Sequence, residues 1–277
     1  MKSALRNKSG FTLVELLVVV GIIALLVSIL LPTTTRARQQ ARAAACASNL
    51  QQIGQAVAAY LIDSKGVLHV PPDRWQWVTS TAPTKLISNV DKNAYWGVAY
   101  LPYVASKSIY SETGDVKATV YAAARKVFNC PDGGQMDTAF SNTDPATPGH
   151  YGINFIITGK TKSDQWAKAS RYKRASETIF CHDAAEHRLD GSITYNPDTA
   201  GDMLSSFGGT AGNLLEWRPG GEAVIRDFNA GTDGTREYYR HLGKCQVLWL
   251  DGHVSAIARS DGSDVPAAWY WGGPAKP

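Results

Sequence analysis

Gly10-Phe-Thr-Leu-Val-Glu15 is the stretch that decides the fold, because it opens an apolar segment that continues without a break to Leu31. This segment, residues 11–31, has 21 residues, and its clearly polar members are Thr12, Glu15 and Ser28. A helix of that length crosses a hydrocarbon core of about 30 Å. The sequence therefore predicts a transmembrane helix over residues 11–31, preceded by a short basic leader over residues 1–10.

One acid, Glu15, lies inside this apolar segment. A carboxylate within a membrane is costly and usually has a partner and a function. Cleavage after Gly10 would create a partner, since the new amine of Phe11 on a neighbouring copy of the helix can pair with Glu15. The alternative is a Glu close enough to the interface to snorkel or to become protonated. The first interpretation makes Glu15 an assembly residue.

These residues strongly resemble the class III signal of type IV pilins and type II secretion pseudopilins. The matching positions are Gly10, Phe11, Thr12, Leu13, Glu15 and Pro32. The resemblance implies that a prepilin peptidase cuts after Gly10 and methylates the amine of Phe11, and that Glu15 and Pro32 serve assembly. A secretory signal peptide would instead have a shorter apolar region before a small-residue cleavage site.

After Pro32 the same helix is predicted to continue through residues 32–65, now as an amphipathic helix that ends near Gly66. One face recurs at steps of three and four residues, at Cys46, Leu50, Ile53, Val57 and Leu61. Residues 11–64 would span about 80 Å, with a bend at Pro32. We expect an α+β, pilin-like fold, in which an antiparallel sheet of the globular domain (residues 66–277) packs on this face.

A hairpin over residues 241–257 is the clearest element of the globular part. Two β-favouring runs flank Asp251-Gly252, a strong two-residue turn signal. His241 stands ten positions before Asp251, and this H-X9-DG pattern resembles the C-terminal signature of pilin-like proteins with an uncharacterised domain (DUF1559). The runs that also resemble this group lie at residues 46–56, 130–132 and 151–154.

Four cysteines, Cys46, Cys130, Cys181 and Cys245, are available for cross-links. An even number in an exported domain favours disulfides, and four cysteines allow three connectivities. We predict the pairs Cys46–Cys130 and Cys181–Cys245. The alternative is four reduced cysteines that pack as small hydrophobic side chains.

Two groups of polar residues offer ligand types suited to zinc. They are His241, Asp251 and His253 at the hairpin, and His182, Asp183, Glu186 and His187 before it. The alternative is that His241 hydrogen-bonds backbone and pins the hairpin, while Asp251 caps its turn. A third group, Asp227, Asn229 and Asp233, spaces oxygen ligands as calcium (Ca²⁺) loops do, but it departs from an EF-hand and a solvated turn is the default.

The charge balance gives no reason to expect nucleic acid as a partner. The formal net charge is +4, and removal of the three basic leader residues leaves 25 basic against 24 acidic residues. The family resemblance, not the charge, implies a single-pass protein of the inner membrane with its leader in the cytoplasm and its globular domain in the periplasm.

We therefore expect a structural subunit that is processed and then polymerises into a type II secretion pseudopilus or a related type IV filament. Its partners would be the prepilin peptidase/methyltransferase, other copies and pilin-like subunits, and the inner-membrane assembly machinery. No catalytic residues are predicted, so the chain is expected not to be an enzyme. A pilin-anchored module for adhesion or glycan capture is the alternative, and it predicts a pocket lined by tryptophans. A membrane-tethered metal enzyme would require His182, His187, His241 or His253 to converge.

Overall fold

The computed structural model describes residues 12–69, 96–105, 126–133, 150–154, 157–158, 168–184, 188–189, 239–259 and 268–271. The chain divides into two compact units, an N-terminal unit of residues 1–41 and a globular unit of residues 42–277. One long helix, α1, contributes to both.

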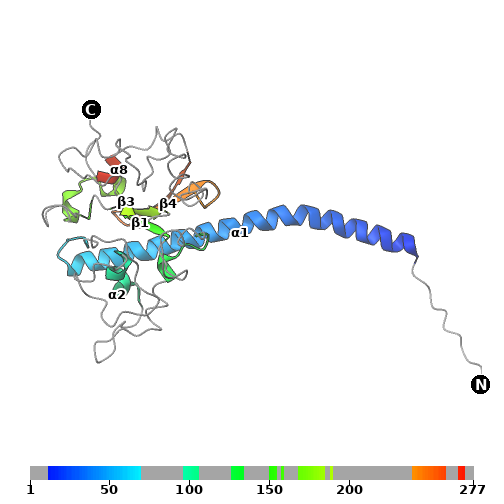
Figure 1. Cartoon of the computed structure of the whole chain (residues 1–277), viewed down its shortest axis with the longest axis horizontal. Coiled ribbons are helices and arrows are strands. Elements are labelled where there is room, and N and C mark those ends of the chain that lie inside the picture. The colour runs from blue at the N-terminus through cyan, green and yellow to red at the C-terminus, as the bar shows by residue number, and fades with distance from the viewer. Residues whose placement is uncertain are drawn as a thin grey trace, which may run out of the picture. The chain divides into compact units, whose positions relative to one another are not determined.

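Helix α1 runs from Leu13 to Asp63 and is 51 residues long (Figure 1), which confirms the helix predicted over residues 11–64. Pro32 lies inside it and the helix continues beyond this residue. The hydroxyls of Thr33 and Thr34 donate to the carbonyls of Leu30 and Leu31, at 2.8 and 2.9 Å. The bend expected at Pro32 stays a prediction.

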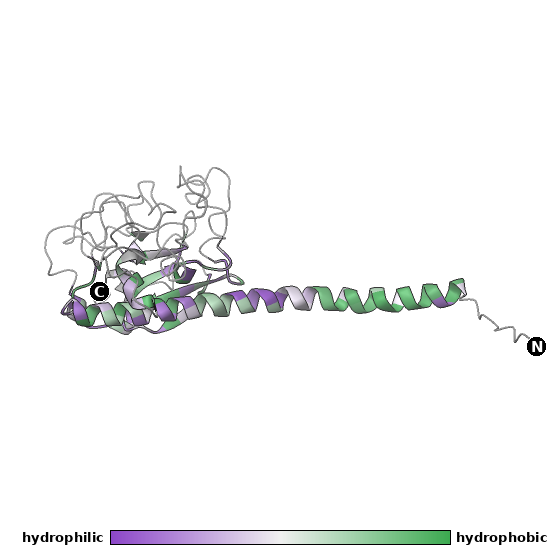
Figure 2. Cartoon of the chain, turned by 90° about the horizontal axis from the view of Figure 1, so that it is seen from below, coloured by the Kyte–Doolittle hydropathy of each residue, from purple (hydrophilic) through white to green (hydrophobic). Residues whose placement is uncertain are grey.

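The N-terminal part of α1 is coloured hydrophobic along most of its length (Figure 2). Between Leu13 and Leu31 the exposed fraction of the large hydrophobic side chains runs from 47% at Val19 to 79% at Leu13. A helix that is hydrophobic all round needs either a protein core or lipid around it. Among the described residues, α1 is the one helix long and apolar enough to cross a membrane.

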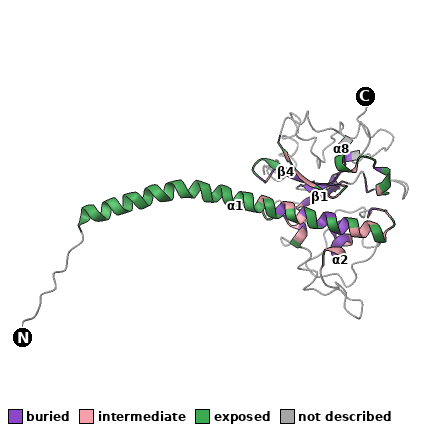
Figure 3. Cartoon of the chain, turned by 180° about the vertical axis from the view of Figure 1, so that it is seen from behind, coloured by how far each residue is buried: buried purple, intermediate pink, exposed green. Residues whose placement is uncertain are grey.

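Within the globular unit, α1 buries one face (Figure 3). Four residues of the predicted stripe, Cys46, Leu50, Ile53 and Val57, are at most 5% exposed, whereas Leu61 is only partly buried. They share a core with residues of the sheet, among them Tyr151, Ile153 and Leu248. The sheet therefore packs on the amphipathic part of the helix, as expected.

The sheet has five strands in the order β3-β1-β2-β4-β5. They are β1 (Tyr151–Asn154), β2 (Ile179–Asp183), β3 (Arg188–Leu189), β4 (Lys244–Trp249) and β5 (Val254–Ala258). Four of them form antiparallel pairs, β1 with β2, β2 with β4, and β4 with β5, which confirms the antiparallel prediction for these strands. The two-residue β3 pairs in parallel with β1, so the complete sheet is mixed.

Short helices complete the described part of the globular unit. They are η1 (Trp96–Tyr100), α2 (Leu101–Val104), η2 (Lys126–Phe128), η3 (Ala169–Arg171), η4 (Ala175–Glu177) and α8 (Ala268–Trp271). Trp96 is buried, contacts the rings of Phe128 and Phe180 edge-on at 5.4 and 6.0 Å, and donates from its indole N–H to the carbonyl of Tyr151. The aromatic side chains thus fill the space beside the central strands.

Helix α1 ends in a cap in which Lys65, and not the expected Gly66, is the first left-handed residue. The N–H of Gly66 donates to the carbonyl of Leu61 at 2.7 Å, and that of Lys65 to Ile62 at 3.3 Å, which is the Schellman arrangement. Lys65 has φ 57° and Gly66 has φ 82°. A non-glycine residue therefore takes the first left-handed position, and the predicted Gly66 follows it.

The predicted hairpin is formed by β4 and β5. Its loop is three residues long, 250–252, and not the two residues that Asp251-Gly252 indicated, because Leu248 pairs with Val254 and the N–H of Trp249 donates to the carbonyl of His253. Gly252 has φ 93°, a conformation that favours glycine. The carboxylate of Asp251 accepts from the N–H of His253 at 3.1 Å, so it caps the turn as expected.

Candidate functional site

The predicted processing site, Gly10 and Phe11, lies outside the described residues, which begin at Thr12. The predicted assembly residues Glu15 and Pro32 both lie in α1, Glu15 in its first turn and Pro32 nineteen residues after the helix start at Leu13. The membrane end of the chain is therefore described from the first residue of the helix cap onward.

Glu15 and Thr12 bind each other at the start of α1. One carboxylate oxygen of Glu15 accepts from the backbone N–H of Thr12 at 2.9 Å and from its hydroxyl at 2.7 Å, while Thr12 Oγ1 accepts from the N–H of Glu15 at 3.3 Å. This reciprocal arrangement is a capping box, and it satisfies N–H groups that have no partner within the helix. The pattern Thr12-x-x-Glu15 is the sequence signal for this cap, beside the assembly role predicted for Glu15.

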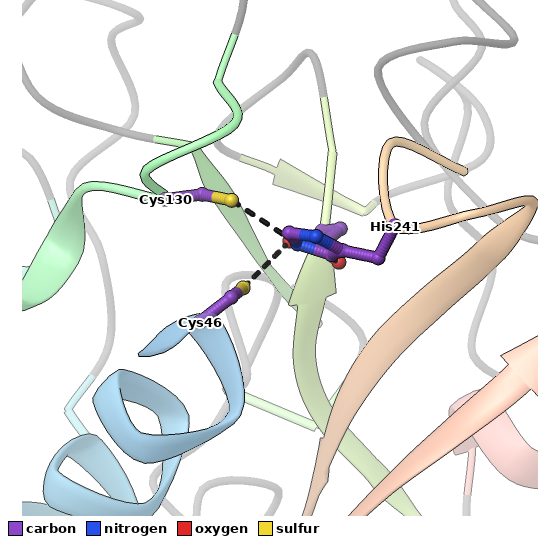
Figure 4. A group of neighbouring side chains, drawn as sticks. Cys46, Cys130 and His241 are labelled. Carbon is purple, nitrogen blue, oxygen red and sulfur yellow. Dashed lines mark hydrogen bonds and ion pairs between the residues drawn. The ribbon is translucent and has the colours of Figure 1, made fainter. Parts of the chain in front are cut away.

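A second group of polar side chains lies inside the globular unit. Cys46 of α1, Cys130 after η2, Asp183 at the end of β2 and His241 before β4 converge from four separate segments (Figure 4). One donor atom from each lies within 4.8 Å of the other three. None of the four residues is more than 3% exposed. We refer to them as the buried cluster.

The donor atoms of the buried cluster contact one another directly. Cys130 Sγ lies 3.1 Å from His241 Nε2, and Cys46 Sγ lies 3.3 Å from Asp183 Oδ1. His241 Nε2 is also 3.5 Å from Asp183 Oδ2. The two thiols and the imidazole ring therefore point toward a common point beside the carboxylate (Figure 4).

Surrounding groups fix the orientation of the cluster. The Tyr151 hydroxyl is 3.2 Å from Cys46 Sγ, and the backbone N–H of Gln246 donates to Asp183 Oδ2 at 2.8 Å. The backbone of His241 exchanges hydrogen bonds with Lys244, across a turn whose central residues have φ 55° and 76°. This turn, just before β4 begins at Lys244, positions the ring of His241 beside Asp183 at the end of β2.

Burial and the neighbouring charges move the pKa values of the cluster in opposite directions. Burial raises the pKa of the Cys46 thiol. Burial also opposes ionisation of Cys130, but hydrogen bonds from Cys46 and His241 outweigh it and lower the pKa of Cys130. For His241, burial lowers the pKa, and the contacts with Asp183 and Cys130 outweigh it and raise the pKa. One thiolate beside one imidazolium is therefore favoured.

The two predicted disulfides are not formed. All four cysteines, each within the described residues, are buried free thiols. Cys181 pairs with Leu248, three residues from Cys245, which separates the two cysteines by roughly 10 Å along the strands, beyond the reach of a disulfide. Cys46 and Cys130 do meet, but each thiol contacts other members of the buried cluster.

The structure does not bring together the zinc group predicted at the hairpin. His241 and Asp251 lie at opposite ends of β4, whose six residues span roughly 20 Å. His253 instead pairs with Asp251 at 2.6 Å, where both side chains are exposed. Of the second group, Asp183 joins the buried cluster, while His182 hydrogen-bonds to the Asp183 carbonyl and to the Tyr270 hydroxyl. The remaining predicted ligands lie outside the described residues: Glu186, His187, Asp227, Asn229 and Asp233.

Comparison with known proteins identifies two families along the chain. The prokaryotic N-terminal methylation motif matches residues 5–31, and the family described as a protein of unknown function (DUF1559) matches residues 35–213. The second match ends before His241, so the H-X9-DG signature stays a prediction. No curated protein and no solved structure matches the chain.

The methylation motif is that of a type IV pilin-like prepilin, and its apolar helix fits a single-pass membrane anchor. Since the second match covers more than half of the chain, the protein belongs to the DUF1559 family and carries an N-terminal methylation motif.

Proposed function

We propose that this protein is a prepilin-type structural subunit, which is cut after Gly10, methylated at Phe11 and polymerised into a type II secretion pseudopilus or a related type IV filament. In this proposal the leader faces the cytoplasm and the globular unit faces the periplasm. The prepilin peptidase, other pilin-like subunits and the inner-membrane assembly machinery are its partners. The DUF1559 family has no assigned function, so the proposal rests on the N-terminal segment.

The exposed apolar surface of α1 between Leu13 and Leu31 is the observation that supports the proposal. Its side chains are about half exposed or more on every side of the helix. In lipid these side chains are solvated, and packing against the same segment of other copies can replace the lipid. A helix that is methylated at its N-terminus and apolar all round is suited to form the core of a filament.

The described tryptophans give no specific support to the alternative of a glycan-binding module. Trp96 and Trp249 are buried in the globular unit, at 2% and 6% exposure. Trp269 packs edge-on against Trp249, with ring centroids 5.2 Å apart. These three side chains act as packing residues.

A filament-assembly assay that compares Glu15→Ala with Thr12→Ala tests the proposal. Each substitution removes two of the three capping contacts, those of the Thr12 hydroxyl in Thr12→Ala and those of the carboxylate in Glu15→Ala. Only Glu15→Ala removes the carboxylate that is to pair with the amine of a neighbouring Phe11. We expect both variants to be cleaved normally, Glu15→Ala to yield no filaments and Thr12→Ala to yield filaments at reduced amounts. Filament yield is measured by shearing and immunoblotting against the chain retained in membranes.

Two results would contradict the proposed role of Glu15. Normal filaments from Glu15→Ala would remove the need for a charge pair. Equal loss of filaments in both variants would assign the effect to the helix cap and not to the carboxylate. A Thr12→Ser variant keeps the capping hydroxyl and is the matched control, with filaments expected at the wild-type level.

A further inference from the structure

We propose that Cys46, Cys130, Asp183 and His241 bind one Zn²⁺ ion in a closed, tetrahedral site that fastens the amphipathic part of α1 to the sheet. The site lies wholly within the globular unit. It takes His241 from the group predicted at the hairpin and Asp183 from the group before it, and none of Asp227, Asn229 and Asp233.

The donor set is that of a structural zinc site. Two thiolates, one imidazole and one carboxylate are all zinc ligands, and the sulfur donors exclude Ca²⁺ and Mg²⁺, which take oxygen ligands. Four protein ligands complete a tetrahedron and leave no position for water or substrate. A closed, fully buried site of this kind stabilises a fold and does not perform catalysis.

Three separations between donors are close to those of a tetrahedral site, with Cys46 beside one oxygen of Asp183 and His241 beside the other. Zinc bonds of about 2.3 Å to sulfur and about 2.0–2.2 Å to nitrogen or oxygen place neighbouring ligands roughly 3.3–3.8 Å apart. The observed separations are 3.1 Å for Cys130 Sγ to His241 Nε2, 3.3 Å for Cys46 Sγ to Asp183 Oδ1 and 3.5 Å for His241 Nε2 to Asp183 Oδ2. The donor atoms all lie within 4.8 Å of one another, so side-chain shifts of up to about 1 Å bring the widest pairs to these separations.

The groups behind the ligands are those that zinc sites use. His241 turns Nε2 toward the cluster, and its other ring nitrogen, Nδ1, lies 3.4 Å from the carboxylate of Asp132. Asp132 is in turn bound by Arg42 at 2.9 Å. A carboxylate behind a ligating histidine fixes its tautomer and orientation. The N–H of Gln246 holds Asp183 in the same way.

Burial of the cluster supplies a second, independent argument. Asp183 is fully buried, and so is the thiol of Cys46 beside it. A buried carboxylate needs a cation or several donors, and a metal ion supplies the charge while the two thiol protons leave. The four ligands come from α1, the segment after η2, β2 and the turn before β4, so one ion would join four segments that are far apart in the sequence.

Metal content of the full-length chain tests the site directly. The chain is extracted from membranes in detergent, purified without chelator and analysed for metal by mass spectrometry. We expect one zinc per chain, and four cysteines that are alkylated without reduction once the chain is denatured in chelator. Replacement of zinc by Co²⁺ should give the visible bands of a tetrahedral ion and a thiolate-to-metal charge-transfer band.

Variants separate the ligands from ordinary buried residues. Cys46→Ser and His241→Ala should lower zinc content at least tenfold after dialysis against a weak chelator. His241→Cys replaces one zinc ligand by another and should keep the ion. Cys181→Ser is the matched control, because Cys181 is as buried as Cys46 but lies outside the cluster, and it should keep one zinc per chain.

Three outcomes would overturn the proposal. The first is a wild-type chain that holds no zinc and gives no tetrahedral cobalt spectrum, a result that does not depend on whether any variant folds. The second is a disulfide between Cys46 and Cys130, seen as failure of both to be alkylated before reduction. The third is a full zinc content in both Cys46→Ser and Cys130→Ser.

Discussion

Glu15 shows how one residue can serve two partners at the same position. In the single chain its carboxylate caps α1 through Thr12, with contacts of 2.7 and 2.9 Å. In a filament, the same carboxylate is proposed to bind the methylated amine of a neighbouring Phe11. Because a carboxylate accepts several hydrogen bonds, the two roles are compatible. The capping contacts orient the charge before a neighbour arrives.

His69 should make the stability of the globular unit depend on pH. Its ring packs edge-on against Tyr60 and Tyr100, at 6.4 and 6.3 Å, and burial lowers the pKa of His69 from 6.5 to about 4. Both facing phenols are uncharged in acid. Between pH 6.5 and 4 the unfolded chain binds a proton that the folded chain does not, so stability is full above pH 6.5 and falls as the pH drops, by at most about 3 kcal/mol.

Replacement of His69 by Phe isolates this contribution. The variant should lose less of its free energy of unfolding than the wild type when urea unfolding is compared at pH 7 and pH 4.5. Acid release of a bound metal would affect both chains. The difference between their losses of unfolding free energy from pH 7 to pH 4.5 therefore reports His69. Equal losses of unfolding free energy in the two chains would show that burial does not keep the His69 ring neutral.

At the residue scale, the sequence points to all four members of the buried cluster but assigns them to different groups. Cys46, Cys130 and His241 were each singled out, and Asp183 was placed in another group. Local spacing predicts neighbours along one helix face or one strand, whereas the four residues of the buried cluster come from four distant segments. The register of β2 with β4 and the turn at His241 place Asp183 beside His241, and packing of α1 and the segment after η2 on the sheet adds Cys46 and Cys130.

At the scale of elements, α1 and the β4–β5 hairpin approach closely at Gly54. A methyl group added there would lie 2.9 Å from Leu248 Cδ1 and 3.3 Å from the carbonyl oxygen of Gly252. Alanine favours a helix over glycine by about 1 kcal/mol, but overpacking costs about 1–3 kcal/mol. The crowding should outweigh the helix preference.

We therefore expect Gly54→Ala to lower the thermal midpoint of the globular unit by roughly 2–4 °C, which corresponds to about 1 kcal/mol for a unit of this size. Gly21→Ala is the control in the same helix, because nothing lies within 4 Å of its added methyl group and Gly21 lies outside the globular unit whose midpoint is measured. Its midpoint should equal that of the wild type. A higher midpoint for Gly54→Ala would mean that the hairpin yields without cost.

Helix periodicity was the most reliable guide to the elements. It predicted the buried stripe at Cys46, Leu50, Ile53 and Val57, because every step of three or four residues returns to the same face. The geometry of the turn was harder to predict from the sequence. Asp251-Gly252 indicated a hairpin, but the length of its loop depends on the register of Leu248 with Val254, and this register is set by packing on the helix.

At the scale of the whole molecule, the chain combines an apolar N-terminal segment with a globular unit built around the amphipathic end of the same helix. The fold class followed from the sequence because both halves of α1 have strong and different hydropathy patterns. The filament type did not follow, because the pattern required for membrane insertion and for a filament core is the same apolar helix.

The N-terminus of the mature chain tests the central claim most directly. The protein is recovered from membranes, and its intact mass and N-terminal residue are determined, with a Gly10→Val variant as the control that the peptidase should leave uncut. We expect the wild-type chain to begin at methylated Phe11. A chain that still begins at Met1, or that is cut at another position, would contradict it and leave Glu15 as a helix cap alone.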